Sequence, residues 1–339
     1  MAGMDANERE LFERSLRPAT ASHTGEALDA ALDELGWRDA LVADPEAAVA
    51  ALFEAQGAAN ATSSALDHVV LAALGVEPGA TPGLVLPAVG SWAPPGEAAG
   101  EGLVIRGLGT AALQRRDLAV VVARTGAADA DEAVGDPAAG GLTITVTVPT
   151  RDLVLRPVHG LDPELGLVAV AADGVLAATP SPCSASATAW GAAVAAGRRA
   201  LAHELVGAAR TMFQLARDHA LDRIQFGRPI ASFQAVRHRL ADTLVAIEAA
   251  DAAARAAWDA PSPLTAALAK AAAGRAARLA ARHGQQVLAG IGFTREHPFH
   301  RYLQRTLVLD RLLGDANSLT RQVGAELLAS RRLPTVLPL

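Results

Sequence analysis

The chain has 339 residues, of which 51% are apolar, with a formal net charge of −6 and a pI near 5.9. This length suits one large domain or two to three ordinary ones, with a sizeable buried core. The acidic balance excludes the basic footprint of a nucleic-acid binder and leaves no polybasic membrane patch. A single cysteine, Cys183, excludes an intrachain disulfide framework and a cysteine-rich metal site.

Residues 1–80 are predicted to form a short N-terminal helical domain. Leu28, Leu32 and Leu35 belong to apolar stripes that recur at helical spacing among Glu, Asp and Ala. The first residues are charged and lack the apolar stretch of a signal peptide. The rest of the chain has no apolar run of membrane-helix type. We therefore expect a cytoplasmic protein without membrane insertion.

Residues 81–184 are predicted to form a middle β domain of β-barrel-like type. Short apolar runs alternate there with Gly and Pro, and Asp173-Gly174 is a turn signal. Residues 107–112 fit a loose dinucleotide fingerprint, which requires a glycine turn that opens a helix. The next segment, residues 118–122, has the pattern of a strand, which argues against a Rossmann site.

Residues 185–339 return to a helical pattern. Two apolar stripes follow helical spacing, Leu201, Leu205, Ala208, Met212 and Leu215, then Phe233, Val236, Leu240, Leu244 and Ile247. Ser262-Pro263 is a helix start, with a capping hydroxyl before a proline in the first turn. A further helix is expected after Pro298. The fold class is therefore α+β multidomain, with a C-terminal antiparallel four-helix bundle.

Residues 223–234 separate two strongly periodic helices. Gly227 and Pro229 break the helical pattern there. The break displays guanidinium, amide and aromatic groups, namely Arg223, Gln225, Phe226, Arg228, Phe233 and Gln234. Guanidinium groups suit a pyrophosphate, amides suit polar edges and rings suit stacking. On residue types alone, a charged turn between helices explains the segment equally well.

The histidines show no spacing that favours a metal site. His203-Glu204 has the start of a zinc protease motif, but Gly207 stands where the second histidine is required. The carboxylates of the predicted bundle are scattered, and periodicity singles out none of them as a buried catalytic base.

Residues 223–234 resemble the signature of the acyl-CoA dehydrogenase family, in which an arginine, a Gln-Phe-Gly turn, a proline and a Phe-Gln pair follow in this order. Residues 286–301 resemble the family's second motif, a Gln-x-x-Gly-Gly-x-Gly-Phe run with its continuation, although Ala289 replaces a usual glycine. The resemblance implies contacts to a neighbouring subunit's FAD, from Arg223, Gln225, Phe226, Phe233, Gln234, Gln286 and Gly290.

The same resemblance places a leucine at the usual position of the catalytic base. Family members remove the α-proton of an acyl-CoA with a glutamate, and ungapped counting from Gly290 puts Leu313 there. Asp315 stands where a threonine is expected near the flavin. Residues 197–199 match the alternative base position on the first bundle helix, again without a carboxylate. Glu204 and Asp310 are the nearest candidates for a displaced base.

A further departure concerns the segment that holds the flavin ring. The family's Thr-Glu-Pro-x-x-Gly-Ser-Asp run is matched by residues 85–92, in which Val85, Leu86 and Trp92 replace the polar side chains. Groups that contact a neighbour's FAD are therefore retained, while groups that hold the chain's own flavin ring are lost.

This pattern resembles the non-catalytic chain of heterotetrameric acyl-CoA dehydrogenases of actinobacterial steroid side-chain degradation. It implies a partner subunit that supplies the glutamate, an acyl-CoA substrate and an electron-transfer acceptor. Three alternatives stay open: a self-sufficient dehydrogenase with a displaced base, a flavin-dependent monooxygenase of the same fold, and a scaffold that binds no flavin.

Overall fold

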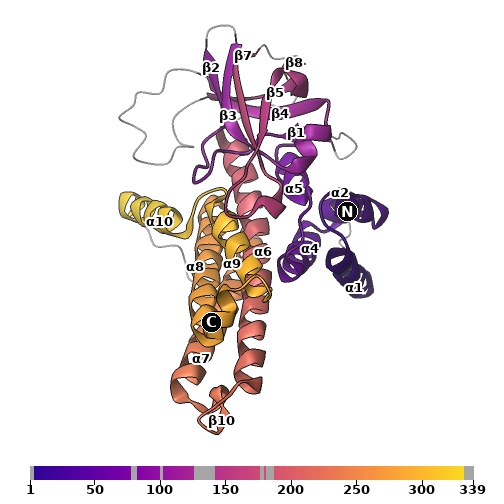
Figure 1. The fold of residues 1–339 in the computed structure, drawn as a ribbon. Helices are drawn as coiled ribbons and strands as arrows, with labels where there is room; N and C mark the ends of the chain where they lie inside the picture. The colour runs from indigo at the N-terminus through magenta and orange to yellow at the C-terminus, as the bar shows by residue number, and fades with distance from the viewer. Residues whose placement is uncertain are drawn as a thin grey trace.

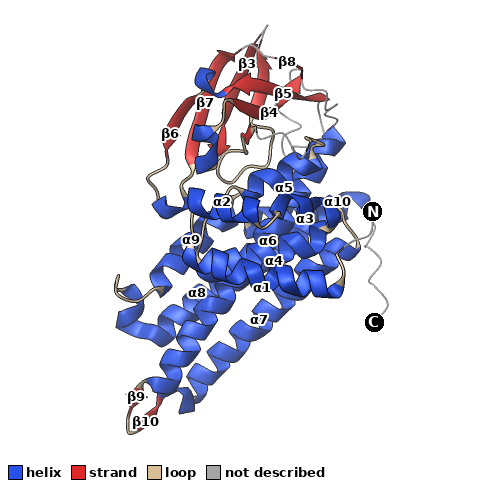
Figure 2. Ribbon diagram, turned by 90° about the vertical axis from the view of Figure 1, so that its right-hand side faces the viewer, coloured by secondary structure: helices blue, strands red, loops and turns tan. Residues whose placement is uncertain are grey.

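The computed structural model describes residues 4–77, 82–99, 102–125, 142–175, 179–180 and 187–331, so Cys183 lies outside the described residues. Short helices come first, a sheet follows and long helices form the C-terminal part (Figure 1). In the side view the sheet lies at one end of the molecule and the long helices extend away from it (Figure 2). This arrangement confirms the fold class predicted from the sequence.

The N-terminal part consists of α1 (Ala6–Ser22), α2 (Glu26–Glu34), α3 (Trp37–Ala43), α4 (Pro45–Ala59) and α5 (Ala65–Ala73). Asp44 caps α4, with Pro45 in its first turn. Helix α4 packs closely on a long helix of the C-terminal part, because each of the two helices has a glycine in the contact. Gly57 belongs to α4 and Gly207 to the C-terminal helix. A Cβ on Gly57 would lie 2.1 Å from the Glu204 carbonyl, and one on Gly207 would lie 2.2 Å from the Glu54 carbonyl.

The middle part is one mixed sheet. Its strands are β1 (Gly83–Leu84), β2 (Gly96–Ala99), β3 (Gly102–Gly109), β4 (Leu118–Thr125), β5 (Leu142–Pro149), β6 (Val154–Pro157), β7 (Val168–Val175) and β8 (Thr179–Pro180). The order is β6-β7-β3-β2-β4-β5-β8, with β1 beside β4. A short 3₁₀ helix, η1 (Ala111–Arg115), connects β3 to β4. Residues 107–112, which fit the loose dinucleotide fingerprint, are therefore followed by a strand, as expected.

The turn predicted at Asp173-Gly174 is wrong. Strand β7 runs through both residues to Val175. Gly174 has a φ of +72°, and the pairing of β3 with β7 shifts register between Leu103 and Ile105. Gly174 therefore accommodates an irregularity within the strand pair. In the sequence, a glycine in such an irregularity looks the same as a glycine in a turn.

The C-terminal part contains α6 (Ala187–Asp222), α7 (Gln234–Asp259), α8 (Pro263–Leu288), α9 (Phe299–Arg311) and α10 (Ala316–Ser330). Ser262 caps α8 and Pro298 precedes α9, as predicted. Most buried residues of α8 are alanine or glycine, which lets α6 and α7 approach it closely. Helix α10 lies beside α8, on the side away from the N-terminal helices (Figure 1). Within the described ranges, no helix has the length and apolar character needed to cross a membrane.

Candidate functional site

The break between α6 and α7 is a β-hairpin at the far tip of the bundle (Figure 1). It pairs β9 (Ile224–Gln225) with β10 (Arg228–Pro229) in antiparallel register. Phe226 and Gly227 have φ values of +53° and +74°, the left-handed pair that a two-residue hairpin turn requires. A non-glycine residue in this conformation is strained. The tip therefore holds Phe226 outward in a defined position.

The aromatic and cationic side chains of this tip face solvent. Phe226 is 91% exposed, and its ring meets that of Phe233 edge to face with centroids 6.0 Å apart. The Arg228 guanidinium lies 4.4 Å from the Phe233 ring centroid. The exposed side chains of Arg223 and Gln234 form no hydrogen bond or ion pair with the described parts of the chain. These groups present stacking and charge to a ligand outside this chain.

The second motif lies against the first. Val287 packs with Ala216 and Ala220 of α6, and Ile230 and Val236 from the hairpin side pack on the same cluster. Gln286 is exposed at the end of α8, and Gly290 is exposed in η6 (Ala289–Phe293). A Cβ on Gly290 would meet nothing within 4 Å in this chain. Close backbone approach at Gly290 therefore stays a prediction about a group outside this chain.

Leu313 occupies a buried turn between α9 and α10. It is 3% exposed and has a φ of +56°. A Cβ on Gly197 of α6 would lie 2.5 Å from Leu313 Cδ1, so the leucine fills the space above that glycine. Arg198 donates from Nε to the Leu313 carbonyl at 3.0 Å. The two base positions that the family resemblance identifies thus face each other without a carboxylate.

Trp92 closes the same region from the sheet side. Its ring lies beside Gly314, where an added Cβ would be 2.9 Å from the indole Cε3. The Trp190 indole N–H donates to the Trp92 carbonyl at 3.0 Å, and the Arg198 guanidinium carbon is 5.2 Å from the Trp92 ring centroid. The residue 85–92 segment and the residue 312–315 turn are therefore in direct contact.

Lys270 is the only lysine in the sequence and is fully buried. Its Nζ donates to the carbonyls of Asp310 and Gly314, each at 2.8 Å. Burial lowers the pKa of this amine to about 7. Lys270 thereby fixes the turn that contains Leu313. Neither this role nor that of Arg198 was predicted, although a lone lysine among many arginines was a visible signal.

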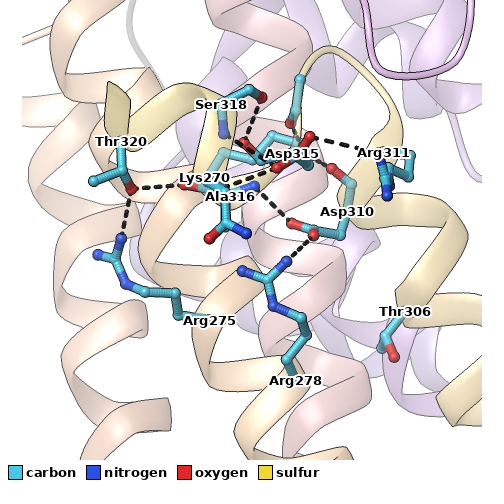
Figure 3. Close-up of polar contacts among 12 residues, drawn as sticks. Lys270, Arg275, Arg278, Thr306, Asp310, Arg311, Asp315, Ala316, Ser318 and Thr320 are labelled. Carbon is cyan, nitrogen blue, oxygen red and sulfur yellow. Dashed lines mark hydrogen bonds and ion pairs between the residues drawn. The ribbon is translucent and has the colours of Figure 1, made fainter. Parts of the chain in front are cut away.

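The carboxylates of this turn have structural partners (Figure 3). Asp310 pairs with Arg278 Nη1 at 2.6 Å and accepts the Ala316 N–H at 3.1 Å. Asp315 caps α10 by accepting the N–H groups of Asn317 and Ser318. Burial opposes ionisation of Asp315, but these N–H donors outweigh it and lower its pKa. Both carboxylates are thus engaged by backbone N–H groups or a guanidinium of this chain.

Glu204, the other candidate for a displaced base, faces α4. It is 2% exposed, and burial raises its pKa to about 7. Gln56 hydrogen-bonds its carboxyl and Arg305 lies nearby, while Oε1 has no protein partner. The side chain lies in the packed contact between α4 and α6, two turns along α6 from Gly197. Within the described ranges, no group of three or more His, Cys, Asp or Glu is arranged to hold a metal ion.

Comparison with known proteins identifies the C-terminal part. Residues 188–328 match the sequence model of the acyl-CoA dehydrogenase C-terminal domain. The acyl-CoA dehydrogenase IpdE2 of Mycobacterium tuberculosis is 44% identical over 126 residues, 37% of this chain. That match spans 40% of the relative's length.

Solved structures match nearly the whole chain at the level of fold. Butyryl-CoA dehydrogenase of Megasphaera elsdenii has a TM-score of 0.74 at 16% identity, covering 97% of this chain and 100% of its own. The ChsE4–ChsE5 complex of Mycobacterium tuberculosis gives 0.69 at 21% identity, with 96% of this chain and 89% of the matched chain covered. The chain therefore has the acyl-CoA dehydrogenase fold.

Proposed function

We propose that this chain is a subunit of a heteromeric FAD-dependent acyl-CoA dehydrogenase. The match of residues 188–328 to the C-terminal domain of that family, the similarity to IpdE2 and the shared fold support this proposal. In this proposal, the hairpin of this chain and the end of α8 contact the adenosine and diphosphate portion of FAD in a partner subunit. The partner supplies the catalytic glutamate.

The contact between Trp92 and Gly314 carries the proposal. The family resemblance puts a subunit's own flavin ring near residues 85–92 and the turn after α9, and in this chain Trp92 lies against Gly314 there. The nucleotide-contacting side chains at the bundle tip are exposed and available. In this proposal the groups at the bundle tip bind FAD of the partner, and the region around Trp92 holds no flavin ring of its own. A shared site explains why the two regions differ.

The absence of a carboxylate at position 313 also supports a partner that supplies the base. Carbon–carbon desaturation of an acyl-CoA requires a base aimed at the α-carbon, and Leu313 has no atom that accepts a proton. The chemistry that bound FAD supplies is acceptance of two electrons from the thioester. The role of this chain is to position the cofactor through Arg223, Phe226 and Gln286 and to leave proton abstraction to its partner.

The relatives support the type of complex and substrate. ChsE4–ChsE5, whose fold the chain shares, is a complex of two differently named proteins. By analogy we propose an α2β2 assembly in the cytoplasm, a bulky acyl-CoA of steroid type and a separate electron-transfer acceptor. The substrate assignment rests on this analogy alone.

The test is FAD retention by the native assembly. The chain is purified from its source cells under native conditions, together with the subunit that co-elutes. The double variant Arg223→Ala/Gln234→Ala is compared with Arg217→Ala/Gln214→Ala, which removes the same residue types from an exposed face of α6. We expect the first pair to weaken FAD binding at least tenfold and the control to leave it unchanged. Equal FAD affinity in both pairs, or a chain that purifies alone with stoichiometric FAD and dehydrogenates an acyl-CoA, would refute the proposal.

A further inference from the structure

A groove of about 510 Å³ lies between α8 and α9, a size within the usual range of small-molecule sites. Three arginines and a glutamine of α8 line one side, while Leu303 and Leu307 of α9 line the other. Leu307 is 38% exposed in this chain. The groove therefore combines cationic walls with an apolar floor that this chain leaves partly open.

Two of the three arginines already interact with other side chains of this chain. Arg278 pairs with Asp310, and Arg275 donates to the Thr320 hydroxyl at 2.9 Å (Figure 3). Arg282 is exposed and forms no hydrogen bond or ion pair with the described parts of the chain. A guanidinium has five donors in a fork that matches phosphate oxygens. Arg282 is thus the group in the groove that is free to bind an anion.

The groove leads directly to the second motif. Arg275, Arg278, Arg282 and Gln286 follow one another along α8 at spacings of three, four and four residues, so they lie on one helix face. Gln286 is the last of this row, one turn from Arg282. A ligand that contacts Gln286 therefore has Arg282 within reach as it enters the groove.

We propose that Arg282 binds the diphosphate of the same FAD that the hairpin contacts. This inference rests on the proposed function and extends it to a residue outside both sequence motifs. The arginines on the α8 side of the groove complement the two phosphate charges. Arg278 stays paired with Asp310, which offsets its charge, so Arg282 supplies the cationic group for the diphosphate.

The experiment measures nucleotide affinity of the deflavinated native assembly by calorimetry, with FAD, ADP and AMP as probes. Arg282→Ala is compared with Arg321→Ala, because Arg321 is also an exposed arginine, on α10. We expect Arg282→Ala to weaken FAD and ADP about tenfold and AMP much less, because AMP lacks the second phosphate. The control should leave all three affinities unchanged.

The outcomes separate this inference from the proposed function. Unchanged FAD and ADP affinity in Arg282→Ala, with loss of affinity in Arg223→Ala/Gln234→Ala, overturns the groove assignment alone. Unchanged affinity in both variants overturns the shared site itself. Dissociation of the assembly by Arg282→Ala, with FAD affinity of the remaining complex intact, identifies the groove as a subunit contact and also overturns the inference.

Discussion

Trp92 and Gly314 touch across the junction of the sheet and the bundle, with the indole Cε3 only 2.9 Å from the place of a Cβ on residue 314. Gly314 has a φ of +98°, a conformation that favours glycine over any other residue. A side chain at position 314 would meet both Trp92 and Leu319.

Removing the indole should destabilise the fold. Trp92 is partly buried against Arg198, Gly314 and Leu319, so Trp92→Ala should lower the free energy of unfolding by about 2–4 kcal/mol. Val89→Ala in the same segment is the control, because Val89 is 56% exposed. Denaturant unfolding measures both. A loss below about 0.5 kcal/mol for Trp92→Ala, in the range of surface changes, would show that the indole does not fill this space.

Gly197 and Leu313 should be energetically coupled. Gly197→Ala places a methyl 2.5 Å from Leu313 Cδ1, which should cost about 1–3 kcal/mol by overpacking. In a Leu313→Ala background the methyl has room, so the cost should largely vanish. Gly191→Ala on the same helix is the matched control, because a Cβ there meets nothing within 4 Å. Additive effects in the double-mutant cycle would contradict the observed packing.

Lys270 should make stability rise with pH above neutrality. Its pKa is about 7 in the folded protein against 10.5 for an ordinary lysine, so the unfolded chain binds more protons between these values. Stability should therefore increase from pH 7 to pH 10 relative to Lys270→Met, on the order of a few kcal/mol. The measurement is urea unfolding of both proteins at several pH values. Parallel pH profiles would mean that the amine is not buried as described.

Glu204 should make the protein less stable as pH rises toward 7, the opposite of the effect of Lys270 above pH 7. Burial raises its pKa to about 7 from 4.5, so ionisation in the folded state costs stability as pH rises between these values. Glu204→Gln keeps a hydrogen-bonding partner for Gln56 and should gain stability relative to wild type over this window. Glu34→Gln, at an exposed position, should show no such trend.

The same variant tests the displaced-base alternative. If a partner supplies the base, Glu204→Gln in the native assembly should retain dehydrogenase activity within about twofold, because the carboxyl faces α4 in a packed contact. Loss of activity by several orders of magnitude, with normal FAD content and stability, would instead assign proton abstraction to Glu204.

Local signals in the sequence predicted the framework. The order of helices and strands follows from apolar periodicity, and the start of α8 follows from Ser262 before Pro263. Gly227 and Pro229 predicted the break that the structure resolves into a hairpin. The turn wrongly predicted at Asp173-Gly174 shows the limit of such signals, because strand pairing overrides a glycine's local preference.

The long-range contacts of the site could not be predicted in the same way. The family resemblance indicated that Val85, Leu86 and Trp92 replace polar groups, but the sequence did not show which residues these side chains contact. Trp92 meets Gly314 across more than 200 residues of sequence, and the Lys270 contacts to the α9–α10 turn join separate helices. Such contacts depend on tertiary packing, which periodicity does not encode.

The stoichiometry of FAD in the native assembly tests the central claim most directly. Flavin absorbance of the assembly, combined with quantitative amino-acid analysis of its chains, gives the number of FAD molecules per copy of this chain and of its partner. A shared site predicts one FAD for each pair of unlike chains, and none bound to this chain when it is isolated. One FAD per polypeptide, with flavin retained by this chain alone, would contradict it.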